Sequence, residues 1–183
     1  VHAIPGTLRT SVLIFFLVCA ARRARGDVRV HNSMLVHVTR FTDVQAQVAR
    51  LLDEELQDCR RQLEYEGAGG SLRDELERLW QEEFAPKFGT LSDAFPLDDL
   101  PSIQWNDVER QLFDAVKRIT VRTINGSAKE ALDYVDHPNG LSVIAVGGDK
   151  LARGLTLEGL SVSYFIRTSR MYDTLMQMGR WFG

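Results

Sequence analysis

Apolar residues recur along the chain at two kinds of spacing, which predict helices and strands. Residues 8–25 follow the start signals Pro5 and Thr7 and stop at Gly26, which predicts a helix. A second helix is predicted from Thr42 to the segment EGAGG, because apolar side chains recur there at helical spacing: Val44, Val48, Leu51, Leu52, Leu56, Cys59 and Leu63. Short apolar runs rich in β-branched residues predict buried strands at 33–38, 141–148 and 161–167.

The remaining segments complete a pattern of strands followed by helices. Residues 119–124, ITVRTI, alternate apolar and polar side chains, as a strand near the edge of a sheet does. Residues 71–84 and 108–116 predict amphipathic helices, separated by an irregular connection at 84–106, so we interpret 67–118 as a helical insertion. Residues 171–183 return to a helical pattern. The order predicts one doubly wound α/β lobe over residues 1–183, with a parallel sheet of about four strands.

The composition excludes several classes of protein but does not indicate a function. The net charge of −3 and the pI of about 5.8 give no overall attraction for nucleic acid, so any such contact has to be local. Cys19 and Cys59 lie in helical patterns and lack the spacing of a disulfide framework or a zinc site. The apolar run at 11–20 is shorter than the roughly 20 residues that span a bilayer. We therefore expect a cytoplasmic protein without membrane contact.

The segment GGDKLARGLTLEGL, residues 147–160, joins two of the predicted strands. Gly147, Gly148 and Gly154 can bring backbone N–H groups close to an anion, and Lys150 and Arg153 add positive charge. By the predicted topology this loop and residues 39–42 both lie at the carboxyl edge of the sheet, where ligands bind in such folds. The alternative is a tight connection whose charges are solvated.

Three polar side chains outside this loop are further candidates. Gln177 and Arg180 lie one turn apart near the end of the chain, and an arginine held at a domain edge can reach a phosphoryl group on a neighbouring domain. Alternatively, Arg180 pairs with Asp173 or caps its own helix. Arg40 follows the strand at 33–38 and either contacts phosphate or caps the next helix.

Other polar and aromatic residues have structural interpretations. His37 lies in a predicted buried strand, and we expect it to be a core residue. The aromatic side chains in apolar runs are also expected in the core: Tyr164, Phe165 and Trp181. Glu158 is expected to pair with Arg153 or Lys150 and hold the loop closed.

The loop and the C-terminal segment together resemble a known family. GGDKLARGLTLEGL followed by YFIRTSRMYDTLMQMGRWFG resembles motifs five and six of superfamily-two helicases, in the form found in the Z1 domain, a family described as candidate endonucleases and associated with helicase modules in bacteria. PGTLRTSVLIFFLVCAARR and HNSMLVHVTRFTDVQAQV resemble the first helix and the motif-four-like strand and turn of that family. The resemblance covers most of the chain outside the predicted insertion.

The resemblance implies the second RecA-like lobe of a nucleic-acid-dependent ATPase. The residues at the motif-five loop are Gly148, Lys150, Arg153, Gly154 and Thr156. Such a loop touches the nucleic-acid backbone and communicates with the nucleotide; Arg40 is a candidate for the same backbone contact by its predicted position at the carboxyl edge. Gln177 and Arg180 match the motif-six residues that face ATP, although only one residue separates Gln177 from Gly179 where the family has two.

The functional prediction is a motor lobe of a DNA-dependent ATPase, in a bacterial restriction or phage-defence system. The chain contains no GxxxxGK loop followed by Ser or Thr, and no Asp-Glu pair after an apolar strand. ATP and Mg²⁺ are therefore expected to bind mainly to an upstream lobe of a larger protein, and this chain alone is expected to be inactive. It also lacks a convincing nuclease residue set. The alternatives are part of a DNA endonuclease whose cutting residues lie elsewhere or in the insertion, and a noncatalytic module that docks a protein partner through its acidic helices.

Overall fold

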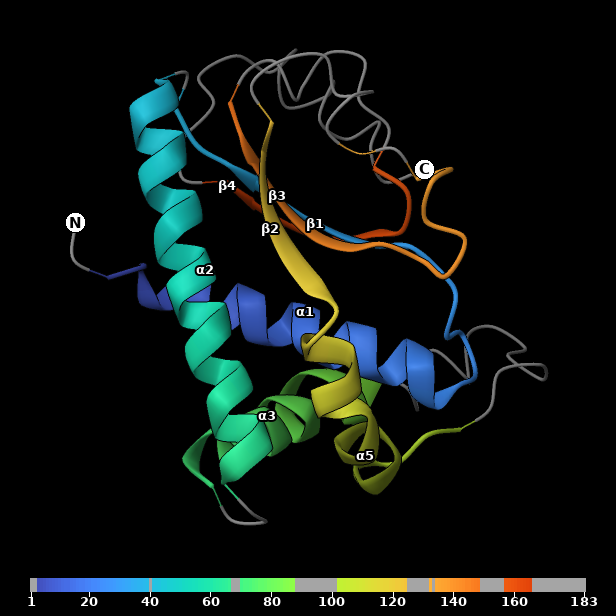
Figure 1. Ribbon diagram of the computed structural model, residues 1–183. Helices are drawn as coiled ribbons and strands as arrows, with labels where there is room; N and C mark the ends of the chain where they lie inside the picture. Colours follow the sequence, from blue (N-terminus) through green and yellow to red (C-terminus); the bar gives the residue numbers. More distant parts are fainter. Residues whose placement is uncertain are drawn as a thin grey trace.

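The computed structural model describes residues 3–39, 41–66, 70–87, 102–124, 132, 134–148 and 157–165 (Figure 1). Its elements in chain order are α1 (Gly6–Ala24), β1 (Asn32–His37), α2 (Thr42–Tyr65), α3 (Ser71–Leu79), the π-helical turn η1 (Trp80–Phe84), α5 (Trp105–Val116), β2 (Ile119–Ile124), β3 (Ser142–Gly147) and β4 (Leu160–Phe165). The helices and strands predicted within these residues are all present. The predicted C-terminal helix lies outside the described residues.

The four strands form one parallel sheet in the order β2-β3-β1-β4. This confirms the α/β class and is consistent with the open sheet of a RecA-like lobe. β1 and β3 are central, and their side chains alternate between two apolar clusters: Met34 and Ile144 face one cluster, whereas Leu35 and Val143 face the other. Burial on both faces explains why these strands read as continuous apolar runs in the sequence.

The described helices form two layers on one side of the sheet (Figure 1). α1 and α2 lie directly against the strands, while α3 and α5 pack on the outside of α1 and α2. α1 buries a broad apolar face that includes Phe15 and Phe16, both fully buried. The helices of the predicted insertion therefore complete the same core as the sheet: Leu76, Trp80 and Leu112 belong to the cluster that holds Phe15.

The boundaries of the irregular connection after α3 differ from the prediction. The chain is helical through η1, as predicted for 71–84, and continues as helix to residue 87; within η1 the rings of Trp80 and Phe84 stack with centroids 5.3 Å apart. α5 begins at Trp105, earlier than the predicted start at 108, because Gln104 and Asp107 form a reciprocal capping box. Trp105 is buried, so tertiary packing extends the helix into a stretch without helical periodicity.

The prediction of a fully buried strand at 161–167 is wrong for the described part, β4. Its residues are intermediate or exposed, and Phe165 retains 37% of its surface. Among the described strands, β4 lies at the edge of the sheet beside β1 and has no second neighbour. Tyr164 packs against the core with its ring, and its hydroxyl lies 2.7 Å from Thr7 Oγ1, so the core interpretation holds for that residue.

An arginine on α2 holds the connection between the outer helix α5 and the strand β2. The guanidinium of Arg60 donates hydrogen bonds to the carbonyl oxygens of Val116, Lys117 and Ile119. Carbonyls at the end of a helix have no partner within that helix, and a cation there is favourable. Arg60 therefore caps α5 and positions the first residue of β2.

A second arginine joins three helices. Arg9 of α1 donates from Nε to Glu55 of α2 at 2.8 Å, and from Nη1 to both carboxylate oxygens of Glu75 of α3 at 2.6 and 2.7 Å. The hydrogen bond to Glu75 is the main reason that the pKa of Arg9 is raised. The three side chains are only 24–32% exposed, so solvent screens this triad less than the pairs on the surface.

Replacing Arg9 with methionine is expected to destabilise the protein by about 2 kcal/mol, because Glu55 and Glu75 would lose their shared counter-charge in a part-buried site. Urea unfolding would measure the change. Arg50→Met removes an exposed pair with Glu54 and should cost less than about 0.5 kcal/mol. Equal losses in the two variants would contradict a structural role of the triad.

Candidate functional site

The carboxyl ends of all four strands form one row across the sheet. Gly147 is the register partner of both Ile124 and His37, and His37 is also the partner of Phe165. The prediction that the turn after β1 and the loop after β3 lie at the same edge is thereby confirmed for their first residues, which leave the sheet side by side. Val38 N donates to Gly147 O at 2.8 Å, which joins the two segments by a hydrogen bond.

The turn after β1 is held from inside the protein. Gln45, only 4% exposed, donates from Nε2 to the carbonyl oxygen of Thr39 at 2.8 Å. Its Oε1 is buried without a hydrogen-bond partner. The Thr39 hydroxyl oxygen accepts a hydrogen bond from Phe41 N at 3.2 Å. Gln45 was not predicted from the sequence, where its polarity at a position one turn into an amphipathic helix is the only signal that points to it.

The start of α2 adds backbone N–H groups and an apolar surface to this edge. Phe41 stands at the N-cap and forms no side-chain cap there, and Asp43 is the acidic residue of the first turn. Phe41 is 59% exposed, and Val44 is also exposed. A helix N-terminus carries partial positive charge and N–H groups that are not used within the helix. This edge therefore combines backbone donors with aromatic and aliphatic surface.

His37 ends β1 in the middle of the row. It is 3% exposed, as expected for a core residue, and its ring lies 5.6 Å from the ring of Phe165. The prediction that Phe165 is itself a core residue is wrong, because its position at the end of an edge strand leaves it partly exposed. The two rings therefore contact each other where β1 and β4 end.

Most of the predicted site residues lie outside the described residues. They are Arg40, Lys150, Arg153, Gly154, Thr156, Gln177 and Arg180, and the aromatic residue Trp181 is another. Gly148 is described and is buried directly after β3. The structure thus places the start of the predicted loop at the carboxyl edge, and the roles of the other residues stay predictions.

The loop returns to the sheet at its opposite, amino edge. Glu158 Oε2 lies 3.7 Å from His31 Nε2, so its described partner is a histidine to which the sequence analysis assigned nothing. His31 Nδ1 accepts a hydrogen bond from Leu141 N at 3.0 Å, which leaves Nε2 to carry the proton toward Glu158. The predicted pairs of Glu158 with Lys150 or Arg153 involve residues outside the described ones.

A serine and a tyrosine fix the same return. Ser33 Oγ donates to the carbonyl oxygen of Glu158 at 2.8 Å and lies 2.9 Å from the hydroxyl of Tyr134. Burial is the main cause that raises the pKa of Tyr134. Ser33, His31 and Tyr134 therefore anchor the end of the loop, by hydrogen bonds and a ring contact, where the chain enters β4.

The cysteines show no sign of chemistry. Burial raises the pKa of both Cys19 and Cys59 to about 12, so the thiols stay protonated and unreactive. Across the described ranges, no group of histidine, cysteine, aspartate and glutamate side chains is arranged to hold a metal ion. Within those same ranges, every helix is too short or too polar to cross a membrane.

Comparisons with known proteins connect the chain to one family. Residues 7–183 match the family described as the Z1 domain. Searches of curated proteins and of solved structures gave no match. The match spans the sheet, the helices and the C-terminal segment alike, so the outer helices are included in the family's extent.

Proposed function

The chain belongs to the Z1 domain family, and from this premise we propose that it acts as the second motor lobe of a superfamily-two helicase-like, DNA-dependent ATPase. ATP with Mg²⁺ would bind mainly to an upstream lobe of the same protein, and a role in bacterial restriction or phage defence fits such a motor. The observation that carries the proposal is the adjacency of the two candidate segments at the carboxyl edge, where Val38 and Gly147 are joined by a hydrogen bond.

The geometry of the sheet supports a cleft at this edge. Ligands of open parallel sheets bind beyond the carboxyl ends of the strands, in the crevice formed by the loops there. Gly147 and Gly148, both buried, start the predicted phosphate-facing loop in the centre of the row, and neither has a side chain that would stand between the backbone and a ligand. The neighbouring α2 N-terminus favours negative charge.

The residues assigned to this edge fall into two groups, one that would contact DNA and one that would contact the nucleotide. Arg40, Lys150 and Arg153 would contact the DNA backbone as point charges or forked donors, which requires no base recognition. Gly154, Thr156, Gln177 and Arg180 would face the nucleotide. In this arrangement the loop after β3 touches both ligands, so a change at the nucleotide can alter the grip on DNA.

The sharpest test measures DNA binding and ATP hydrolysis together. In the complete protein that contains this lobe, Lys150→Ala combined with Arg153→Ala should raise the concentration of DNA needed for half-maximal ATPase stimulation by about tenfold, as expected for the loss of two phosphate contacts. Hydrolysis without DNA should stay unchanged. The salt dependence of DNA binding should become shallower, because fewer counterions are released.

Arg110→Ala is the matched control for charge. Arg110 lies on the outer helix α5, is exposed and pairs with Asp107, far from the strand ends. It should leave both DNA stimulation and its salt dependence unchanged. Absence of any ATP hydrolysis in the complete protein would contradict the motor, and an unchanged DNA requirement in the double variant would contradict the assignment of the loop.

A further inference from the structure

A small polar pocket lies at the amino edge of the sheet, opposite the candidate cleft. It is formed where the ends of α1 and α5 approach the first residues of β1 and β3. A strand of six residues separates it from the carboxyl edge, which is about 16 Å at 3.3 Å per residue. The pocket is therefore distinct from the site that the proposed motor function uses.

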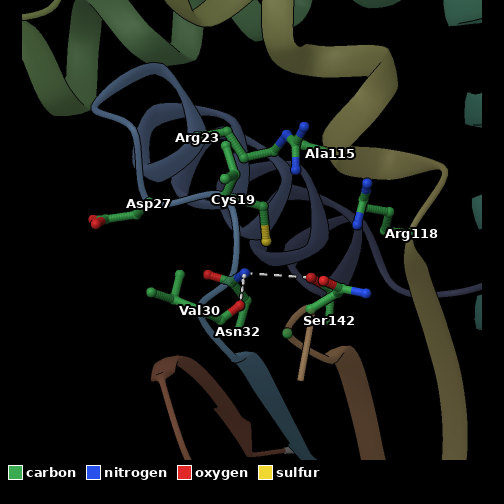
Figure 2. A pocket seen from close by; sticks show the side chains of 11 residues that line it. Cys19, Arg23, Asp27, Val30, Asn32, Ala115, Arg118 and Ser142 are labelled. Carbon is green, nitrogen blue, oxygen red and sulfur yellow. Dashed lines mark hydrogen bonds between the residues drawn. The ribbon is translucent and has the colours of Figure 1, made fainter. Parts of the chain in front are cut away.

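The lining of the pocket is rich in hydrogen-bond donors. In Figure 2, Arg23 and Arg118 extend toward the pocket from the helix ends, Asn32 and Ser142 lie across from them at the strand starts, and the Cys19 sulfur lies between. Asn32 is 6% exposed and donates from Nδ2 to Val30 O and Ser142 Oγ, both at 3.3 Å. These long hydrogen bonds hold the Asn32 side chain in place in the pocket lining.

The two arginines are not neutralised by a contact with a carboxylate. Among the described residues, neither guanidinium forms a hydrogen bond or an ion pair, and the Nε of Arg23 is buried without a partner. Asp114, on the neighbouring turn of α5, has Lys117 as its own hydrogen-bond partner. Arg23 and Arg118 only add to the lowering of the Asp114 pKa through space, after the dominant contribution of Lys117.

Positive charge accumulates around this edge although the chain as a whole carries −3. Arg22 uses its guanidinium on neutral oxygens, the carbonyl of His31 and Oδ1 of Asn32, so its charge also remains uncompensated by a contact. The pocket lining itself includes one carboxylate, the exposed Asp27. The Cys19 thiol contributes no negative charge, because burial raises its pKa to about 12.

We propose that this pocket binds the oxyanion of a phosphate group through the guanidinium groups of Arg23 and Arg118. The enclosed volume is about 10 Å³, which holds one water molecule or one oxygen atom of a larger anion. The rest of the phosphate stands at the mouth, beside Asp27 and Val28. Two planar guanidinium forks on one anion give charge-assisted and directional hydrogen bonds.

Arginine is suited to this role because its charge persists at all physiological pH values and its fork matches oxyanion geometry. Asn139 and Ser142 add neutral donors around the same space. The phosphate could be free in solution or part of a nucleotide or an oligonucleotide. All of these sources present the same tetrahedral oxyanion, and they differ only in what projects from the mouth past the exposed residues.

The test is a thermal-shift titration of this chain with inorganic phosphate, against chloride at equal ionic strength. With a Kd of about 1 mM, 20 mM phosphate should raise the Tm by about 4 °C, because a ligand that binds only the folded state stabilises it. Arg23→Gln and Arg118→Gln should each remove most of this shift. Asp27→Asn should enlarge it, because the repelling carboxylate at the mouth is gone.

Arg110→Gln is the control, because it removes an exposed arginine from the same helix outside the pocket. It should keep the full phosphate response. An equal response in all variants, or an equal effect of chloride and phosphate, overturns the proposal. The same titration with AMP and with a short oligothymidylate identifies the source of the phosphate. If the wild type binds one of these compounds and the two arginine variants do not, the result supports the pocket and assigns its anion to that class of compound.

Because Arg118 is exposed and Arg23 half-buried, the glutamine variants should fold. Their circular dichroism and their Tm in chloride check this directly. The outcome is also separable from the proposed motor function: the weaker DNA stimulation of ATP hydrolysis in the loop variants concerns the carboxyl edge, whereas the phosphate response depends on residues about 16 Å away at the amino edge.

Discussion

Replacement of Arg180 with alanine in the complete protein is expected to lower DNA-stimulated ATP hydrolysis by about a thousandfold. The proposal places this guanidinium across the cleft from the γ-phosphate, where it would stabilise charge that develops during phosphoryl transfer. An arginine that acts in this way contributes mainly to the transition state. The turnover number should therefore fall much more than the affinity for ATP.

The variant Arg180→Lys separates charge from geometry. Lysine keeps the positive charge but lacks the planar fork, so it should recover only part of the activity. Binding of DNA without nucleotide should be equal in wild type, Arg180→Lys and Arg180→Ala. The exposed Arg110 again supplies a control, since Arg110→Ala should hydrolyse ATP as the wild type does. ATP hydrolysis that survives Arg180→Ala at the wild-type rate would falsify the assignment.

Replacement of Gly159 with alanine should have the largest effect on folding, a loss of about 3–4 kcal/mol. Gly159 has φ +67°, and a Cβ atom there would lie 1.9 Å from the carbonyl oxygen of His31. The neighbouring backbone cannot easily yield, because His31 O accepts from Arg22 and Gly159 O accepts from Ser33 N. The expected fall in Tm is about 10 °C for a chain of this size.

Alanine substitutions at two other glycines separate the cost of the backbone conformation from the cost of the steric clash. Gly26 has φ +99° with open space around its Cβ position, so Gly26→Ala measures the cost of the backbone conformation alone, about 1 kcal/mol. Gly6 has open space and is the first residue of α1, so Gly6→Ala should be neutral or slightly stabilising. If Gly159→Ala unfolds at the same temperature as Gly26→Ala, the close approach to His31 has no energetic weight.

The Gly159 variant also connects stability to the candidate site. Gly159 ends the loop whose first residues, Gly147 and Gly148, lie at the carboxyl edge. If the backbone at residue 159 shifts, the distance that the loop between β3 and β4 has to span changes. DNA stimulation should therefore weaken in Gly159→Ala even at temperatures where the protein is folded.

The sequence alone predicted the helices and strands well where one periodicity dominates. The 24-residue helix α2 carries apolar side chains at helical spacing, and β3 is a continuous β-branched run, so local pattern and burial agree. Residues without such a pattern were harder. Trp105 belongs to α5 because its side chain is buried and Gln104 caps the helix, neither of which periodicity reveals.

Part of the candidate site was also predictable, because parallel strands share one carboxyl edge. The adjacency of the segments after β1 and β3 follows from that rule once the strands are recognised. Gln45 was not predictable in this way: its contact with Thr39 depends on the tilt of α2 over the end of β1. The contact of Glu158 with His31 likewise joins residues 127 positions apart (158 − 31).

Sequence by itself determined the element types and the parallel α/β class, because local side-chain chemistry and spacing decide these. Only the tertiary structure decided the strand order β2-β3-β1-β4, which leaves β4 and Phe165 at an exposed edge. It also decided which charges meet. Arg9 finds Glu55 and Glu75, whereas Arg23 and Arg118 converge without a carboxylate contact among the described residues. The reason is physical: a side chain's partners depend on where distant helices end, and no local pattern encodes that distance.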